Sequence, residues 1–336
     1  MKLGLYMATQ WPKGADIGQE IANLCEQTRA AKDNGFETIL IGQHFLTEPL
    51  QMVQAEPLIA RLAGEGTGLE LGIGVVLLPM LNPVMVAEYA ASLDWLTGGK
   101  YILGLGVGYR PEEFEGLGAP IEARGERFEE ALHVMRRLWT EDTVEHKGKH
   151  FTVPGAGVSI RPVRPGGPAV WIGGEAKVAV RRAGRLGCPW LIAPSSTFDG
   201  IRGLKAVYDD ARTEAGHGPP SRRPVIRECV IGATREQALA VSMPSLLGKY
   251  ESYASWGQKD AAGGGSGGSS LKDGFDSFMA ERFLVGDEAE VTDQIARYRD
   301  ELGLDQILVR LQWPGLAQQH VLAAMERMGR VMARLN

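Results

Sequence analysis

The sequence is poor in cysteine, in long apolar runs and in excess charge of one sign. Its 336 residues include three cysteines, Cys25, Cys188 and Cys229, which are scattered and lack the spacing of metal ligands. We therefore expect them to be small buried residues, and we expect no metal site. No stretch approaches the roughly 18 uncharged apolar residues of a membrane span. The net charge of −5 gives no electrostatic reason to expect nucleic acid or an anionic membrane as a partner.

Two sequence signals are also missing from the start of the chain. Residues 1–11 have one lysine and a short apolar run, which predicts a strand and not a signal peptide. We therefore expect a cytoplasmic protein. The run MATQWPKG follows this strand where a dinucleotide-binding fold would have a glycine-rich turn, so the dinucleotide fingerprint is absent at that place.

What the chain does have is a regular alternation of short apolar runs with longer amphipathic ones. Such an alternation predicts a parallel sheet, and it fits both a doubly wound sheet and a closed barrel. Eight units without a domain break favour a single α/β domain over residues 1–336, a (β/α)8 TIM barrel. The expected strands are 2–7, 38–41, 70–77, 101–107, 169–172, 190–193, 225–231 and 306–309.

Two segments depart from this regular pattern. Residues 143–167, rich in Gly, Pro and Val, predict an excursion after the fourth helix of the barrel. Residues 257–275 include the run AAGGGSGGSS at 261–270 and predict a flexible Gly/Ser-rich loop before the last βα unit. The composition of this loop is compatible with a natural segment or with an engineered replacement.

Function in such a barrel lies at the carboxyl ends of the strands, so the residues there are candidates for a site. His44 follows the second strand, where it could reach a ligand and titrate near neutrality, or simply bond to a neighbouring loop. Glycines in the third and fourth strands, including Gly74, Gly106 and Gly108, suggest close approach by a flat ligand. Gly173 and Gly174 open a helix and could hold a phosphate, although a simple turn would use the same residues.

Taken together, the ordered motifs QHF, GIGVVLLPMLNPV, GLGVGYRPEEFEGLG, ARGERFEEAL and VWIGGEA resemble those of the bacterial-luciferase-like family. This family also includes coenzyme F420-dependent dehydrogenases, and the resemblance covers nearly the whole chain. It implies a barrel that holds FMN or F420 at the strand ends, with the ring over the strand glycines. It also implies a non-prolyl cis peptide at Gly74-Val75. The implied cofactor-binding residues are Gly74, Val75, Gly106, Gly108, Tyr109, Gly173, Gly174, Glu175 and Ala176, with Arg110 or Arg124 assisting at the phosphate.

The same resemblance implies that His44 is the catalytic acid/base beside the flavin. Luciferases have a His-His pair at this place, of which Gln43 occupies the first position here, and they have a cysteine where this chain has Gly106, which argues against light emission. The expected activity is a monooxygenase in which reduced FMN, supplied by a flavin reductase, reacts with O2 to form a C4a-peroxyflavin that oxidises a small organic substrate. F420-dependent hydride transfer and non-catalytic flavin binding are the alternatives. The resemblance further implies a homodimer that pairs through helices near 54–64 and 82–97.

Overall fold

The computed structural model describes residues 1–255 and 271–335 of the chain. Most of the predicted loop 257–275, namely 257–270, lies outside these residues. Its last five residues belong to a helix, α9 (Leu271–Arg282).

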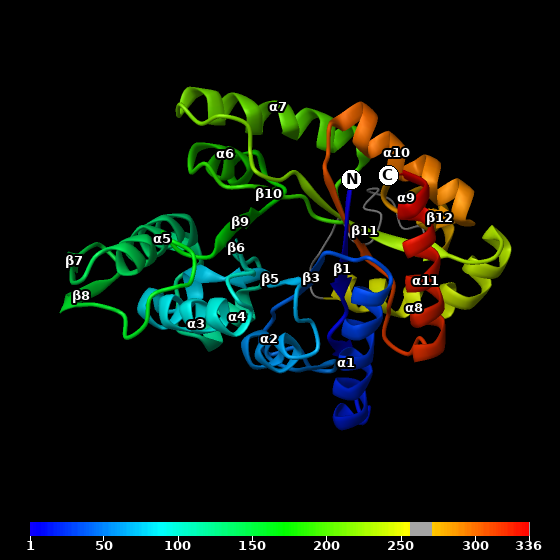
Figure 1. The fold of residues 1–336 in the computed structure, drawn as a ribbon, viewed down its shortest axis with the longest axis horizontal. Coiled ribbons are helices and arrows are strands. Elements are labelled where there is room, and N and C mark those ends of the chain that lie inside the picture. The colour runs from blue at the N-terminus through cyan, green and yellow to red at the C-terminus, as the bar shows by residue number, and fades with distance from the viewer. Residues whose placement is uncertain (256–270, 336) are drawn as a thin grey trace.

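A nine-stranded sheet forms the centre of the described structure (Figure 1). Its strand order is β10-β9-β6-β5-β3-β1-β13-β11-β12, and every pairing between neighbours is parallel. All eight predicted strands form. The additional strand β12 is only three residues long, which is too short to leave a clear apolar pattern in the sequence. The strands are β1 (Lys2–Met7), β3 (Thr38–Ile41), β5 (Glu70–Leu77), β6 (Tyr101–Gly106), β9 (Ala169–Gly173), β10 (Trp190–Leu191), β11 (Pro224–Ile231), β12 (Leu284–Gly286) and β13 (Gln306–Arg310).

The sheet curls, so that its two ends approach each other. Ile192, which follows β10, forms a parallel bridge with Val225 of β11. Inside the curl lies an apolar cluster to which eight of the strands each contribute. Its members include Tyr6, Leu40, Val75, Ile102, Trp171, Leu191, Ile226 and Leu308. Because these side chains alternate with outward-facing ones along each strand, one face of the sheet packs on itself and the other packs on helices.

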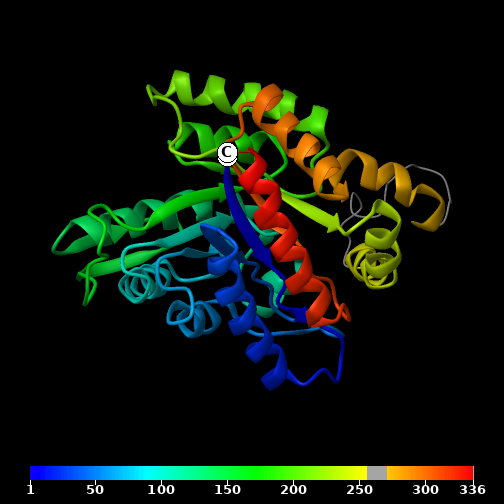
Figure 2. The same cartoon turned by 45° about the vertical axis from the view of Figure 1, so that its right-hand side comes forward.

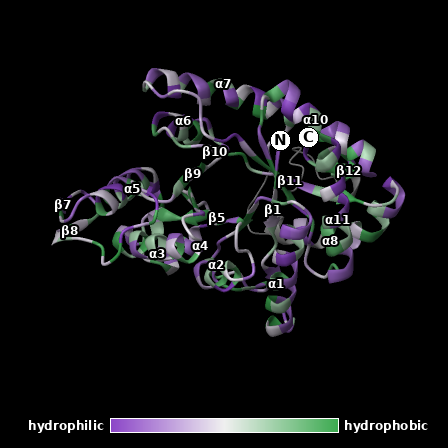
Figure 3. Ribbon diagram, in the orientation of Figure 1, coloured by the Kyte–Doolittle hydropathy of each residue, from purple (hydrophilic) through white to green (hydrophobic). Residues whose placement is uncertain are grey.

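Helices surround the outer face of the sheet, and the final helix α11 crosses beside β1 (Figures 1 and 2). The helices have both polar and apolar residues (Figure 3), as expected for helices that pack one side on a sheet. In α11 the methionines Met325, Met328 and Met332 are buried. The helices are α1 (Ile17–Asp33), α2 (Ala55–Ala63), α3 (Pro83–Leu96), α4 (Pro111–Gly116), α5 (Arg124–Thr140), α6 (Lys177–Arg185), α7 (Phe198–Glu214), α8 (Arg235–Ser255), α9, α10 (Glu288–Leu302) and α11 (Gln318–Leu335).

Local sequence signals explain where several helices begin and end. The Asp16 carboxylate accepts a hydrogen bond from Gln19 N at the start of α1, which is the usual N-cap arrangement. Asp287 and Glu290 form a reciprocal capping box at the start of α10. Gly35, with φ +75°, follows α1 as the Asn34-Gly35 pair predicts.

Two small antiparallel pairs lie outside the main sheet. The segment 143–167 contains β7 (Val144–Lys147) and β8 (Thr152–Ala156), a hairpin that lies beside α5 (Figure 1). Near the strand ends, β2 (Gln10–Trp11) pairs with β4 (Gln51–Met52). This second pair ties the loop after β1 to the loop after β3, next to the site described below.

Two expectations drawn from composition can be compared with the structure. The three cysteines are buried, as predicted, and they carry free thiols. Within residues 1–255 and 271–335, no helix is both long enough and apolar enough to cross a bilayer.

Candidate functional site

A cavity of about 380 Å³ opens at the carboxyl ends of the sheet strands. This volume falls in the range of small-molecule sites, which is roughly 300–1,000 Å³. Its lining includes every predicted site residue except Arg110 and Arg124, namely His44, Gly74, Val75, Gly106, Gly108, Tyr109, Gly173, Gly174, Glu175 and Ala176. Residues separated by more than a hundred positions in the sequence therefore meet where a ligand could bind.

Val75 is held in the cavity wall by glycines on two neighbouring strands. A Cβ atom at Gly106 would lie 2.4 Å from Val75 Cγ2, and one at Gly173 would lie 2.8 Å from Val75 Cγ1. These glycines therefore make room for the Val75 side chain, which forms part of the surface that a ligand would meet. The Gly74-Val75 peptide is cis, as predicted, and the pairing of β5 with β6 shifts register at this point.

A second pair of glycines, Gly72 of β5 and Gly104 of β6, serves the packing of the two strands and not the approach of a ligand that the sequence suggested. A Cβ at Gly72 would lie 2.2 Å from Ile102 O, and one at Gly104 would lie 2.4 Å from Ile73 O. Their small size thus lets the backbones of β5 and β6 approach each other around the register shift. Only part of the glycine pattern concerns the space for a ligand.

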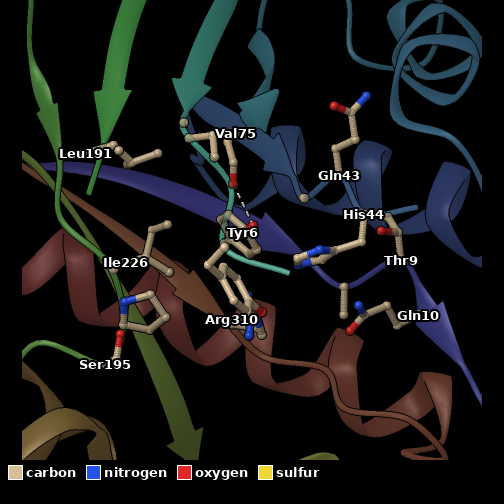
Figure 4. Close-up of a pocket in the computed structure, with 18 of the residues that line it drawn as sticks. Tyr6, Thr9, Gln10, Gln43, His44, Val75, Leu191, Ser195, Ile226 and Arg310 are labelled. Carbon is tan, nitrogen blue, oxygen red and sulfur yellow. Dashed lines mark hydrogen bonds between the residues drawn. The ribbon is translucent and has the colours of Figure 1, made fainter. Parts of the chain in front are cut away.

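His44 lies at the cavity and is held by a carboxylate that the sequence analysis did not identify. Its Nδ1 is 2.9 Å from Glu113 Oε1, and Glu113 has no exposed side-chain surface. The same oxygen accepts a hydrogen bond from Phe45 N at 2.9 Å and lies 3.4 Å from Arg110 Nη1. Because Glu113 Oε1 is an acceptor for these donors, the consistent tautomer of His44 carries its proton on Nδ1. Nε2 then bears the lone pair that can exchange a proton with a ligand, and the ring points into the cavity (Figure 4).

Gln43, which replaces the first histidine of the luciferase pair, ties strand ends together. Its Nε2 donates to Glu56 Oε1 at 2.8 Å, and its Oε1 accepts from Leu77 N at 3.1 Å. Figure 4 shows its amide directed away from His44. Gln43 therefore positions the end of β5, just after Val75, through its hydrogen bonds.

Arg110 and Arg124 do not lie in the cavity lining. Arg110 Nη1 donates to Phe45 O at 2.8 Å and Nη2 to Leu46 O at 3.2 Å, which holds the loop that carries His44. Arg124 Nη1 donates to Ile121 O at 3.0 Å. Contact of either guanidinium with a cofactor phosphate stays a prediction.

The start of α6 supplies the backbone of the predicted phosphate site. Gly173, Gly174, Glu175 and Ala176 line the cavity directly before this helix. Among the described residues, no side chain caps the first turn of α6, so its amide groups can serve an anion. The Glu175 carboxylate accepts a hydrogen bond from Ser195 Oγ. Glu175 would therefore serve an anion site through its backbone amide and not through its carboxylate.

A buried charged cluster lies on another part of the cavity wall. Glu228 of β11 accepts from Arg310 Nη1 of β13 at 2.9 Å, from Trp313 Nε1 at 3.1 Å and from Lys249 Nζ of α8. The Arg310 guanidinium also lies 4.5 Å from the centre of the Tyr6 ring, while Tyr6 Oη donates to Gly74 O at 2.6 Å. The cluster is thus connected to the peptide that carries Val75.

Charge and burial shift the protonation of these groups. Burial and the nearby Arg310 lower the pKa of Lys249 to about 7, although Glu228 acts in the opposite direction. Burial would raise the pKa of Glu228, but Arg310 and Lys249 outweigh it and hold the pKa below its ordinary value. Burial raises the pKa of Tyr6, which therefore keeps its proton and remains a donor.

The sequence contains a signal for this cluster that belongs to no motif, namely charged residues within apolar strands. Glu228 interrupts the apolar run of β11, and Arg310 ends the apolar run of β13. A charged residue inside a buried strand requires a partner, which marks it as a candidate site residue. Lys249 and Glu113 lie on helices, where charges are common, so nothing in their local sequence distinguishes them.

Comparison with known proteins identifies the family of the chain. Residues 1–306 match the family model for luciferase-like monooxygenases. The 4-hydroxyprotoasukamycin monooxygenase of Streptomyces nodosus subsp. asukaensis is 30% identical over 247 residues, covering 71% of this chain and 67% of that protein.

Solved structures with the same fold include proteins of two cofactor types. The oxygenating component of 3,6-diketocamphane monooxygenase from Pseudomonas putida, in complex with FMN, has a TM-score of 0.81 and 20% identity, covering 99% of both chains. An F420-dependent secondary alcohol dehydrogenase with an F420-acetone adduct has a TM-score of 0.80 and 16% identity, covering 100% of this chain and 99% of that one. At these identities the likeness shows the fold alone.

Proposed function

Because the chain belongs to the luciferase-like monooxygenase family, we propose that it uses reduced FMN and O2 to oxidise a small organic substrate. The observation that carries this proposal is the convergence of three features on one cavity. These are the Val75 surface, the open amino end of α6 and the His44-Glu113 pair. Each corresponds to one requirement of the chemistry, namely a surface for a flat ring, a site for a phosphate and a group that moves a proton.

The described residues fit FMN by their shape and their donors. Val75 would lie against the ring, and the backbone amides from Gly174 to Ala176 would bind the phosphate at the start of α6. When bound, reduced FMN would supply two electrons for the reaction with O2, in which one oxygen atom goes to the substrate and the other leaves as water. His44 Nε2 would exchange a proton with the reacting group, while Glu113 holds the orientation of the ring.

Exclusion of water is a further task for the cavity wall. Leu77, Leu191 and Ile226 give it an apolar surface, and Met52 and Tyr109 line it as well. An apolar wall limits the access of water to the reacting atoms and so reduces the loss of reducing equivalents as hydrogen peroxide.

F420-dependent hydride transfer is the second candidate function. One observation favours it, because a histidine held by a buried carboxylate can also protonate the oxygen of a ketone during reduction. Non-catalytic flavin binding is a weaker alternative, since it would need neither Glu113 nor the orientation that Glu113 imposes on His44.

We also propose that the sheet closes into a (β/α)8 barrel and that the protein forms a homodimer. The Ile192-Val225 bridge and the eight-strand interior cluster support closure of the sheet. For the dimer, α3 exposes Met85, Tyr89 and Leu96, whose helical spacing places them on one face, and such a face is suited to a partner copy. We also propose a separate flavin reductase as the source of reduced FMN.

Isotope incorporation tests the proposed reaction. The protein would be mixed with reduced FMN and a panel of cyclic ketones, phenols and aromatic acids under ¹⁸O2, and the products would be weighed by mass spectrometry. We expect one ¹⁸O atom in the product of an accepted substrate. Turnover of a ketone to an unlabelled alcohol with reduced F420, and no labelled product with reduced FMN, would favour the second candidate.

A further inference from the structure

The cluster of Glu228, Lys249 and Arg310 is placed to meet a ligand. All three side chains are at least nine-tenths buried, and all three line the cavity. They come from β11, α8 and β13, whereas the Val75 surface and the α6 amides come from β5 and from the end of β9. The cavity therefore has two separate polar regions, and the phosphate site uses only one of them.

The electrostatic character of this cluster favours a negative charge. Two cationic side chains share one carboxylate, which also accepts hydrogen bonds from Trp313 and lies 3.4 Å from Tyr250 Oη. With Lys249 protonated, the two cations outnumber the one carboxylate, so the cluster has a net charge of +1. An anionic oxygen beside Lys249 and Arg310 would balance this charge.

The surroundings of the cluster are apolar and aromatic. The Tyr6 ring lies against Arg310, and Tyr250 packs edge-on against Phe278 with ring centres 5.2 Å apart. Ile226 lies two residues before Glu228 on the same face of β11 and lines the same cavity. Figure 4 shows Tyr6, Arg310 and Ile226 around the same open space. Such a wall suits a ring that carries a single acidic oxygen group.

We propose that Arg310 and Lys249 bind an anionic oxygen of the substrate, so that the substrate is a small cyclic organic acid, a carboxylate or a phenolate. This inference rests on the proposed function, since it names the substrate class of the same site. Arg310 offers a planar donor fork that matches a carboxylate, and Lys249 offers a point charge beside it. Glu228 is the positioning residue that keeps both cations in place.

Calorimetric titration tests the inference with benzoate and its neutral isostere benzamide, with 4-nitrophenolate as the phenolate probe. The full-length protein would be measured with and without saturating oxidised FMN. We expect benzoate or 4-nitrophenolate to bind at least tenfold more tightly than benzamide. Whichever anion binds more tightly identifies the acid class. Anion binding that is no tighter than benzamide binding would overturn the inference.

The variant Lys249→Met removes one charge and leaves Arg310 and Glu228 as a neutral pair. It should reduce the preference for benzoate over benzamide by about tenfold, while benzamide affinity stays within a few fold. Lys205→Met is the matched control, because Lys205 lies on α7 and pairs with Asp209. It should keep the full preference. An unchanged preference in Lys249→Met would contradict the proposed contact.

The pH dependence of the unmodified protein provides a second measurement. Lys249 faces Glu228 from β11, Arg310 from β13 and Tyr250 on its own helix, with Tyr6 of β1 behind Arg310. The pKa of Lys249 is lowered to about 7, while the pKa of Glu228 is lowered and that of Tyr6 is raised. Benzoate affinity should therefore fall as pH rises from 6 to 8, and a flat profile would count against Lys249.

Competition separates this inference from the proposed function. If FMN displaces benzoate, the two cations belong to the cofactor site and the inference is wrong. If the protein prefers benzoate over benzamide but binds neither oxidised nor reduced FMN, the anion site is supported and the proposed flavin function is wrong.

Discussion

The Val75 surface can be tested by a single methyl group at Gly106. In Gly106→Ala the new Cβ would lie 2.4 Å from Val75 Cγ2, well inside van der Waals contact. Rotation of Val75 gives little relief, because its other methyl faces Gly173, where a Cβ would lie only 2.8 Å away. Val75 or the backbone that carries it must therefore move.

The magnitude follows from the cost of overpacking. Inserting a methyl group into a packed site costs roughly 1–3 kcal/mol. If Val75 moves toward the cavity, bound FMN must push it back, and the affinity for FMN falls by roughly 5- to 150-fold at 1.4 kcal/mol per tenfold. The prediction is thus a measurable loss of FMN affinity in a protein that still folds.

Fluorescence titration with FMN, together with thermal unfolding, measures both effects. Gly203→Ala on α7 is the control, because nothing lies within 4 Å of its added Cβ, and it should leave FMN affinity unchanged. In the double variant Val75→Ala/Gly106→Ala the clashing methyl groups are gone, so part of the affinity should return. Wild-type affinity in Gly106→Ala, or no recovery in the double variant, would refute the role given to Val75.

Three further predictions concern the proton, the assembly and the buried lysine. His44→Ala should lower turnover at least a hundredfold with flavin affinity within a few fold, and Glu113→Gln should lower turnover less; unchanged turnover in His44→Ala would remove its role. The protein should be a dimer by light scattering at micromolar concentration, and Tyr89→Glu should shift it toward monomer; a monomeric wild type would contradict this. Because Lys249 has a folded pKa of about 7, below its unfolded value, it binds fewer protons in the folded state and its contribution to stability should rise with pH above 7. Urea unfolding would measure the difference in unfolding free energy between wild type and Lys249→Met from pH 7 to 9. This difference should change in favour of wild type by at most about 1.4 kcal/mol per pH unit. A constant difference would argue against the lowered pKa.

Most of the sheet could be predicted from the sequence because its strands are buried on both faces and appear as short apolar runs. Runs such as Thr38–Ile41 stand between clear helical patterns, so their number and order follow directly. The three-residue β12 carries too little pattern to be recognised, and the hairpin inside 143–167 was predicted only as an irregular excursion. Segments whose form depends on their packing partners are therefore where the prediction was weakest.

The site was predictable where a motif is local and was missed where it depends on distant pairing. Gly173 and Gly174 indicate that a helix begins within a few residues, and His44 lies just after the end of a strand. The partner of His44 is 69 positions away, and Glu228 meets Arg310 across 82 positions. The curl of the sheet decides which strands bring their side chains together. A single sequence does not contain this information.

The cofactor is the central claim, and an anaerobic titration tests it most directly. The protein would be titrated side by side with reduced FMN, reduced riboflavin and F420, and the dissociation constants would be compared. We predict tight binding of reduced FMN, weaker binding of reduced riboflavin because it lacks the phosphate for the α6 amides, and weaker binding of F420. Tight binding of F420 with no detectable affinity for reduced FMN would contradict the account.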